Sequence, residues 1–125
     1  AAYTPYSGFR VGAALLCADG TVYGGCNIEN AAFGPTCCAE RTAFFKAVSE
    51  GKREFSAIAI VGGPAGKEPE DFCPPCGVCR QVIAEFKIPL IIAGRSEKDY
   101  RTFTLEGILP YAFEEDSLKK EQENP

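Results

Sequence analysis

Two short stretches of the sequence combine cysteine with glutamate or proline at spacings that suit metal chemistry. Residues 38–40 read Cys-Ala-Glu, and residues 75–79 read Pro-Cys-Gly-Val-Cys. The chain has seven cysteines and no histidine, so a metal ion would have to be held by thiolates and carboxylates. An odd number of cysteines, most of them in two short segments, favours metal binding in a reducing compartment over a set of secreted disulfides.

Three thiolates with one open coordination position are typical of a catalytic zinc site, because a structural site closes the fourth position with another protein ligand. Cys38, Cys76 and Cys79 could provide the three thiolates, and Glu40 lies two residues from the first of them. A carboxylate beside the open position can take a proton from water and redeliver it, which is the acid–base role that imidazole cannot fill in this chain. Residues two apart on a regular helix do not face each other, so Cys38 and Glu40 converge only beyond the helix end.

The elements that must position these residues follow from hydrophobic spacing and from Gly and Pro signals. Both cysteine motifs open segments with helical spacing, and helix N-termini favour thiolates through their partial positive charge and free N–H groups. In chain order we expect strands at 11–17 and 21–28, a helix from 38 to Gly51, a strand at 56–61, a helix at 77–86, strands at 90–93 and 100–104, and a helix at 105–109. This order predicts a single α/β domain over residues 1–125 with a mixed sheet of about five strands.

Charge and hydropathy exclude several classes of partner. The net charge is −4 and no basic run is present, so a nucleic acid is a poor candidate partner. No stretch approaches the roughly 18 consecutive apolar residues of a membrane span, and the N-terminal residues lack a secretion-signal pattern. We therefore expect a soluble, cytoplasmic protein that binds neither nucleic acid nor membrane.

Taken together, the motifs resemble the cytidine deaminase family, small zinc enzymes that act on free nucleosides. The zinc motif of this class of deaminase is His or Cys, one residue, Glu, and later Pro-Cys-x-x-Cys. Residues 38–41 and 75–81 match that motif, and residues 6–9, 11–16, 25–32 and 109–113 are also similar to the small nucleoside deaminases. The resemblance implies a three-layer α-β-α fold, one Zn²⁺ per subunit, and a homotetramer with shared active sites.

The resemblance also implies roles for the motif residues. Cys38, Cys76 and Cys79 would hold the zinc, and Glu40 would move a proton from water to the pyrimidine N3 and then to the leaving ammonia. Because three thiolates outweigh the charge of Zn²⁺, Arg41 would offset the excess by donating to the sulfurs. The reaction implied is the hydrolytic deamination of cytidine and 2′-deoxycytidine in pyrimidine salvage.

Substrate contacts follow from the same resemblance, with Asn27 and Glu29 expected on one face at the end of a strand, where they would bind the sugar 3′-hydroxyl. The residues assigned to substrate binding are Phe9, Asn27, Glu29, Ala39, Pro74 and Phe113. Phe9 would pack against the base, the backbone of Ala39 and the carbonyl of Pro74 would read the base edge, and Phe113 would reach a neighbouring subunit's site. Two positions depart from the family: Phe33 stands where many relatives have tyrosine, and Pro74 where serine is common.

Other interpretations remain open at this point. A closed structural zinc site could recruit Cys37 or Cys73 as its fourth ligand, which would leave Glu40 and Arg41 without a chemical role. A related aminohydrolase, such as a blasticidin S deaminase, would keep the zinc and Glu40 but change the sugar-side contacts.

Overall fold

The computed structural model describes residues 1–32, 34–66, 75–96 and 98–110. Its elements are β1 (Phe9–Cys17), β2 (Val22–Cys26), α1 (Ala39–Ser49), β3 (Phe55–Pro64), α2 (Gly77–Glu85), β4 (Leu90–Gly94), β5 (Tyr100–Phe103) and α3 (Leu105–Ile108). The order of strands and helices is the one predicted from the sequence, with bounds that shift by a few residues. Within the described ranges, no helix combines the length and the apolar character needed to cross a bilayer.

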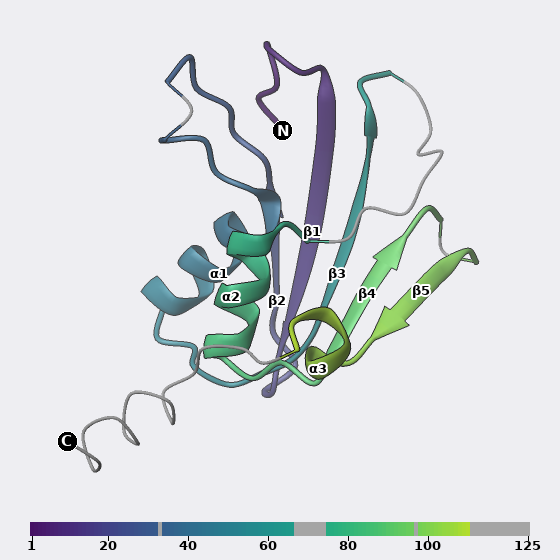
Figure 1. Cartoon of the computed structure of the whole chain (residues 1–125). Coiled ribbons are helices and arrows are strands. Elements are labelled where there is room, and N and C mark those ends of the chain that lie inside the picture. The colour runs from purple at the N-terminus through teal and green to yellow at the C-terminus, as the bar shows by residue number, and fades with distance from the viewer. Residues whose placement is uncertain (33, 67–74, 97, 111–125) are drawn as a thin grey trace, which may run out of the picture.

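The sheet has five strands in the order β2-β1-β3-β4-β5 (Figure 1). Only β3 and β4 run parallel among its neighbouring pairs, so the sheet is mixed as predicted. The β1–β2 connection is the Asp-Gly turn that the sequence indicates: Gly20 has a φ of +91°, and the side chain of Asp19 accepts a hydrogen bond from the Thr21 N–H at 2.9 Å. A positive φ is a conformation that glycine adopts without steric cost.

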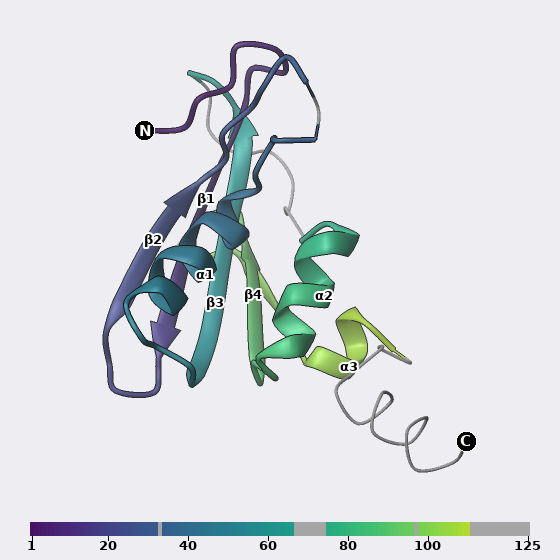
Figure 2. The ribbon, with the colours of Figure 1, turned by 90° about the vertical axis from the view of Figure 1, so that its left-hand side faces the viewer.

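One face of the sheet packs against the helices and forms the hydrophobic core. Alternate strand residues point into it, so Leu15, Ile58 and Ile91 are fully buried together with Phe44 of α1 and Ile83 of α2. α3 adds a buried isoleucine to the same core, and Figure 2 shows α2 and α3 next to each other on this side of the sheet. All three described helices therefore pack against the same face of the sheet.

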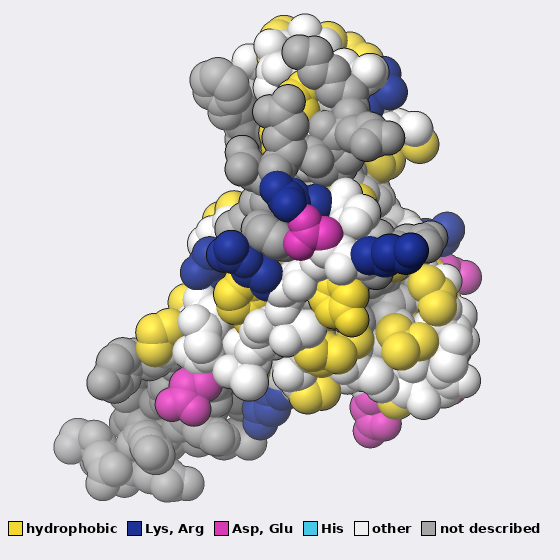
Figure 3. Space-filling model, turned by 90° about the vertical axis from the view of Figure 1, so that its right-hand side faces the viewer, with side chains coloured by type: hydrophobic (Ala, Val, Ile, Leu, Met, Phe, Trp, Pro, Cys, Tyr) yellow, Lys and Arg dark blue, Asp and Glu magenta, His cyan; other side chains and the backbone are white. Residues whose placement is uncertain are grey.

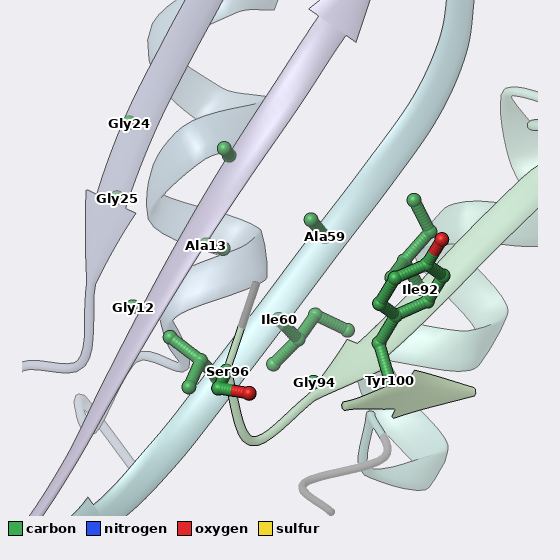
Figure 4. Close-up of a pocket in the computed structure, with 12 residues that line it drawn as sticks. Gly12, Ala13, Gly24, Gly25, Ala59, Ile60, Ile92, Gly94, Ser96 and Tyr100 are labelled. Atoms are coloured by element: carbon green, nitrogen blue, oxygen red, sulfur yellow. The ribbon is translucent and has the colours of Figure 1, made fainter. Parts of the chain in front are cut away.

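The opposite face of the sheet presents mainly small residues. Gly12, Gly24 and Ala59, with the larger Ile92 and Tyr100, line a shallow pocket of about 650 Å³, and α1 is seen behind the strands in Figure 4. From the β5 side, Figure 3 shows hydrophobic side chains gathered below a band of Lys and Arg. In the part of the chain that the structure describes, no helix covers this face, so the second helical layer of the three-layer expectation is not supplied by α1, α2 or α3.

Candidate metal centre

Two helix N-termini bring the three predicted thiols together. Cys38 is the N-cap of α1 and Cys76 is the N-cap of α2, both with extended backbone angles, while Cys79 lies in the first turn of α2. The three sulfurs all lie within 4.8 Å of one another, and those of Cys38 and Cys76 are 3.6 Å apart. A tetrahedral zinc ion with Zn–S bonds of about 2.3 Å requires sulfurs about 3.8 Å apart, so the cluster fits this ion.

The pKa values of the three thiols shift in different directions, whereas the sequence predicts that the helix N-termini favour all of them as thiolates. Burial raises the pKa of Cys38, and burial followed by the charge of Glu40 raises that of Cys79. At Cys76 burial is outweighed by hydrogen bonds from the Cys79 and Val78 N–H groups and from the Cys79 side chain, so its pKa is lowered. A bound divalent cation removes the cost of ionising the two thiols with raised pKa values, because it stabilises thiolates directly.

Arg41 is the positive side chain next to the cluster. Its Nη2 donates to the Cys38 sulfur at 3.5 Å and to the Thr36 carbonyl at 3.3 Å. The hydrogen bond to Cys38 is the main reason why the pKa of the guanidinium is raised. The buried Nε has no partner among the described residues. Arg41 thus places a positive charge beside the Cys38 sulfur.

Glu40 is the only charged residue that is buried among the described residues, with 4% of its surface exposed. It lies in the first turn of α1 and close enough to Cys79 to raise the pKa of that thiol by charge and by a hydrogen bond. Convergence with Cys38 is possible because Cys38 has φ −71° and ψ 154° and so precedes the helix. A carboxylate in this position can accept and donate a proton at the open side of the cluster.

Asn27 and Glu29 lie past the end of β2, which stops at Cys26, whereas the sequence predicts a strand up to Ile28. The backbone of Ile28 pairs with Tyr3 on one side and with Cys37 on the other, which takes it out of the β1–β2 ladder. The side-chain amide of Asn27 binds the first residues of β1: its Oδ1 accepts from the Val11 N–H at 3.0 Å, and its Nδ2 donates to the Phe9 carbonyl at 2.9 Å.

Glu29 holds the segment before β1. Its carboxylate accepts from the backbone N–H groups of Tyr6 and Ser7, each at 3.1 Å, and from the Ser7 hydroxyl. The Ser7 oxygen in turn accepts from the Phe9 N–H at 3.0 Å. The hydrogen bond from the Ser7 side chain is the main cause of the lowered pKa of Glu29. Sequence reasoning missed Ser7, although it lies within the family-like stretch at residues 6–9.

The other predicted residues fall into two groups. Phe9 begins β1 and is 41% exposed, and Ala39 is fully buried at the start of α1. Phe33, Cys73, Pro74 and Phe113 lie outside the described residues. Cys37 is not part of the thiol cluster, and its sulfur instead lies 3.6 Å from the Cys38 carbonyl. The described residues therefore offer no fourth thiolate that would close the site.

Comparison with known proteins matches this arrangement to one family. Residues 1–95 match the model for the cytidine and deoxycytidylate deaminase zinc-binding region. The chain is 52% identical over 120 residues to a cytidine deaminase of Sporosarcina psychrophila, a match that covers 94% of this chain and 84% of that protein. It is 28% identical over 107 residues to a blasticidin-S deaminase of Bacillus cereus, covering 83% and 76% of the two chains. A crystal structure of cytidine deaminase from Burkholderia pseudomallei superimposes with a TM-score of 0.80 at 46% identity, covering 90% of this chain and 87% of that one.

Proposed function

Because this chain belongs to the family of zinc-binding cytidine and deoxycytidylate deaminases, we propose that it hydrolyses cytidine and 2′-deoxycytidine to uridine and 2′-deoxyuridine, releasing ammonia. The reaction breaks the bond between C4 and the exocyclic nitrogen and forms a bond from C4 to the oxygen of water. The observation that carries the proposal is the cluster of three thiols, one of which, Cys79, contacts the buried carboxylate of Glu40.

The proposed mechanism assigns proton transfer to Glu40 and metal binding to Cys38, Cys76 and Cys79. When bound, zinc supplies the activation of a water molecule for attack on C4. Glu40 takes up the proton that the water loses, delivers it to N3 of the ring, and afterwards carries the proton of the new C4 hydroxyl to the departing amine as the C4 carbonyl forms. Burial of Glu40 supports this role, because excluding bulk water reduces the loss of the transferred proton to solvent.

Arg41 would reduce the negative charge around the metal in this mechanism. Three thiolates and Zn²⁺ together carry a net negative charge, which weakens the cation's pull on bound groups. The hydrogen bond from Arg41 to the Cys38 sulfur supports a role in which the guanidinium withdraws part of that charge.

Sugar binding by Asn27 and Glu29 is supported by the hydrogen-bonding capacity that they retain. A carboxylate offers about four acceptor sites, and the bonds described above occupy three at Glu29. Asn27 uses one acceptor site and one N–H, so it keeps one of each. We propose that these free positions meet the sugar 3′-hydroxyl while Phe9 packs against the base. The blasticidin S alternative is not favoured, because the identity to that enzyme is about half that to the cytidine deaminase.

We also propose a homotetramer with shared active sites, located in the cytoplasm, where free thiols stay reduced. In this assembly Phe113 would reach a neighbouring subunit's site, and the backbone of Ala39 and the carbonyl of Pro74 would read the base edge. Light scattering of the active protein tests the assembly, since a fully active monomer would exclude both the tetramer and the role of Phe113.

The deciding experiment measures ammonia release from cytidine and from 2′-deoxycytidine by zinc-loaded protein, beside Glu40→Gln and Glu50→Gln. Glu50 follows the other end of α1 and is exposed, so it is the matched control. Loss of the acid–base group should lower kcat about 10²- to 10⁴-fold with zinc still bound, whereas Glu50→Gln should turn over like the parent. Absence of turnover by the zinc-loaded parent would refute the proposed function.

A further inference from the structure

The hydroxyl of Thr42 lies between two parts of the site. One is the metal side, formed by Cys38, Cys76, Cys79 and Glu40, and the other is the proposed sugar side, formed by Asn27 and Glu29. Its Oγ1 is 3.0 Å from the carbonyl oxygen of Cys26, 3.2 Å from that of Cys38 and 3.6 Å from the sulfur of Cys37. A hydroxyl has one proton to donate, and the Cys26 carbonyl is the nearest of these acceptors. The bond therefore links the first turns of α1 to the last residue of β2.

The start of α1 depends on this hydrogen bond to β2 because no side chain caps the helix. Cys38 is the N-cap residue, but its side chain makes no capping hydrogen bond to the helix. The helix also sits directly on the strand: a Cβ at Gly25 would lie 2.4 Å from the Ala39 carbonyl oxygen and 2.7 Å from the Ala43 nitrogen. Thr42 supplies a polar bond at this close contact, and its backbone N–H donates to the Cys38 carbonyl at 3.1 Å.

We propose that Thr42 is a positioning residue that fixes the zinc ligand Cys38 relative to the sugar-binding Asn27. The carbonyl that it binds belongs to Cys26, the neighbour of Asn27 in the chain, and the helix end that it holds carries both Cys38 and Glu40. The part of this proposal that concerns substrate binding rests on the proposed function, whereas the part that concerns metal binding does not. Without the hydroxyl, the helix end shifts on β2 and both the thiol and the carboxylate lose their alignment with the sugar contacts.

The test compares Thr42→Val, which keeps the shape and removes the hydroxyl, with Thr42→Ser, which keeps the hydroxyl. Thr104→Val is the control for loss of a helix-end hydroxyl away from the site, because Thr104 caps α3 by accepting from the Gly107 N–H. Metal affinity is measured by competition with a chelator, using Zn²⁺ and using Co²⁺, whose charge-transfer bands report bound thiolates and whose d–d bands report the ligand geometry. Kinetics are measured at saturating zinc.

Outer-shell partners of a metal site typically change affinity or activity 10- to 100-fold, so we expect Thr42→Val to bind metal about tenfold more weakly. It should also shift the cobalt bands, raise KM for cytidine and lower kcat, while Thr42→Ser and Thr104→Val stay within about twofold of the parent. Parent-like affinity, spectrum and kinetics in Thr42→Val would overturn the proposal, as would equal losses in Thr42→Val and Thr42→Ser. If the parent fails to deaminate cytidine, the proposed function fails, and the metal titration still decides the role of Thr42.

Discussion

The metal side of the site and the side that we propose to bind the sugar are held by different physical means. On the metal side, Cys79 and Glu40 are buried and their positions follow from where α1 and α2 begin. On the sugar side, Asn27 and Glu29 are held by hydrogen bonds to the backbone of residues 6–11, most of them exposed. Cys79 and Glu40 are thus fixed mainly by packing, whereas Asn27 and Glu29, which we propose to bind the sugar, are fixed by individual hydrogen bonds that can be changed one at a time.

This contrast predicts that substitutions on the metal side reduce turnover severely, whereas substitutions on the sugar side have moderate effects on substrate affinity. Moving a buried group requires the helices to repack, because protein interiors tolerate little change in volume. A side-chain bond at the surface contributes only about 0.5 to 1.5 kcal/mol, so its loss shifts substrate affinity without disturbing the core.

The largest effect is expected for Cys79→Ala, which removes a buried ligand. Turnover should fall by about 10³-fold or more, because the lost metal contributed several kcal/mol to the transition state. Zinc content by atomic absorption should fall with it. The matched control is Cys17→Ala, which empties a buried thiol position outside the cluster. A Cys79→Ala protein with full zinc content would contradict the assignment of this ligand.

An intermediate effect is expected for Ser7→Ala on the sugar side. Without the hydroxyl, Glu29 loses one donor and the Phe9 N–H loses its acceptor, so KM for cytidine should rise about threefold to tenfold with kcat little changed. Steady-state kinetics measure this split. Ser49→Ala, at the exposed end of α1, should leave both constants unchanged. A fall in kcat alone would show that the two sides are not separable as described.

The smallest effect concerns acid stability and Glu29. Hydrogen bonds, first of all from Ser7, hold the pKa of Glu29 below its ordinary value of 4.5. A carboxyl with a depressed folded pKa stabilises the protein above the unfolded pKa, and that contribution is lost as the pH falls through the folded value. Between about pH 6 and about pH 3 the thermal midpoint of the parent should therefore drop further than that of Glu29→Gln. Parallel curves would show that the carboxylate is not a stabilising anchor.

The fold and the metal cluster could be predicted because their signals are local. Apolar spacing, the Asp19-Gly20 turn and Gly51 define the elements, and the motif spacing places Cys76 and Cys79 together at the start of one helix. The mixed character of the sheet follows from the alternation of strands and helices, whereas its order β2-β1-β3-β4-β5, in which β3 lies beside β1, was not predicted.

What the sequence could not predict depends on contacts between distant residues. Ser7 and Glu29 are 22 positions apart, and neither residue type marks the other as its partner. The early end of β2 at Cys26 results from pairing of Ile28 with Tyr3 and Cys37, which no periodicity reveals. Thr42 had one local signal: a threonine inside a helix often bonds the carbonyl four residues earlier, here that of Cys38. Its bond to β2 only becomes visible once the helix is docked.

The sheet topology also sets when, during folding, the thiols can meet. Cys38 and Cys76 are 38 positions apart, and β3, which pairs with β1 on one side and with β4 on the other, lies between them in the chain. Long-range pairing of this kind is slow because loop closure precedes the gain in contacts. We therefore expect the metal to be captured late, once the central strands are joined, so that the rate of its uptake by refolding chains would report completion of the sheet.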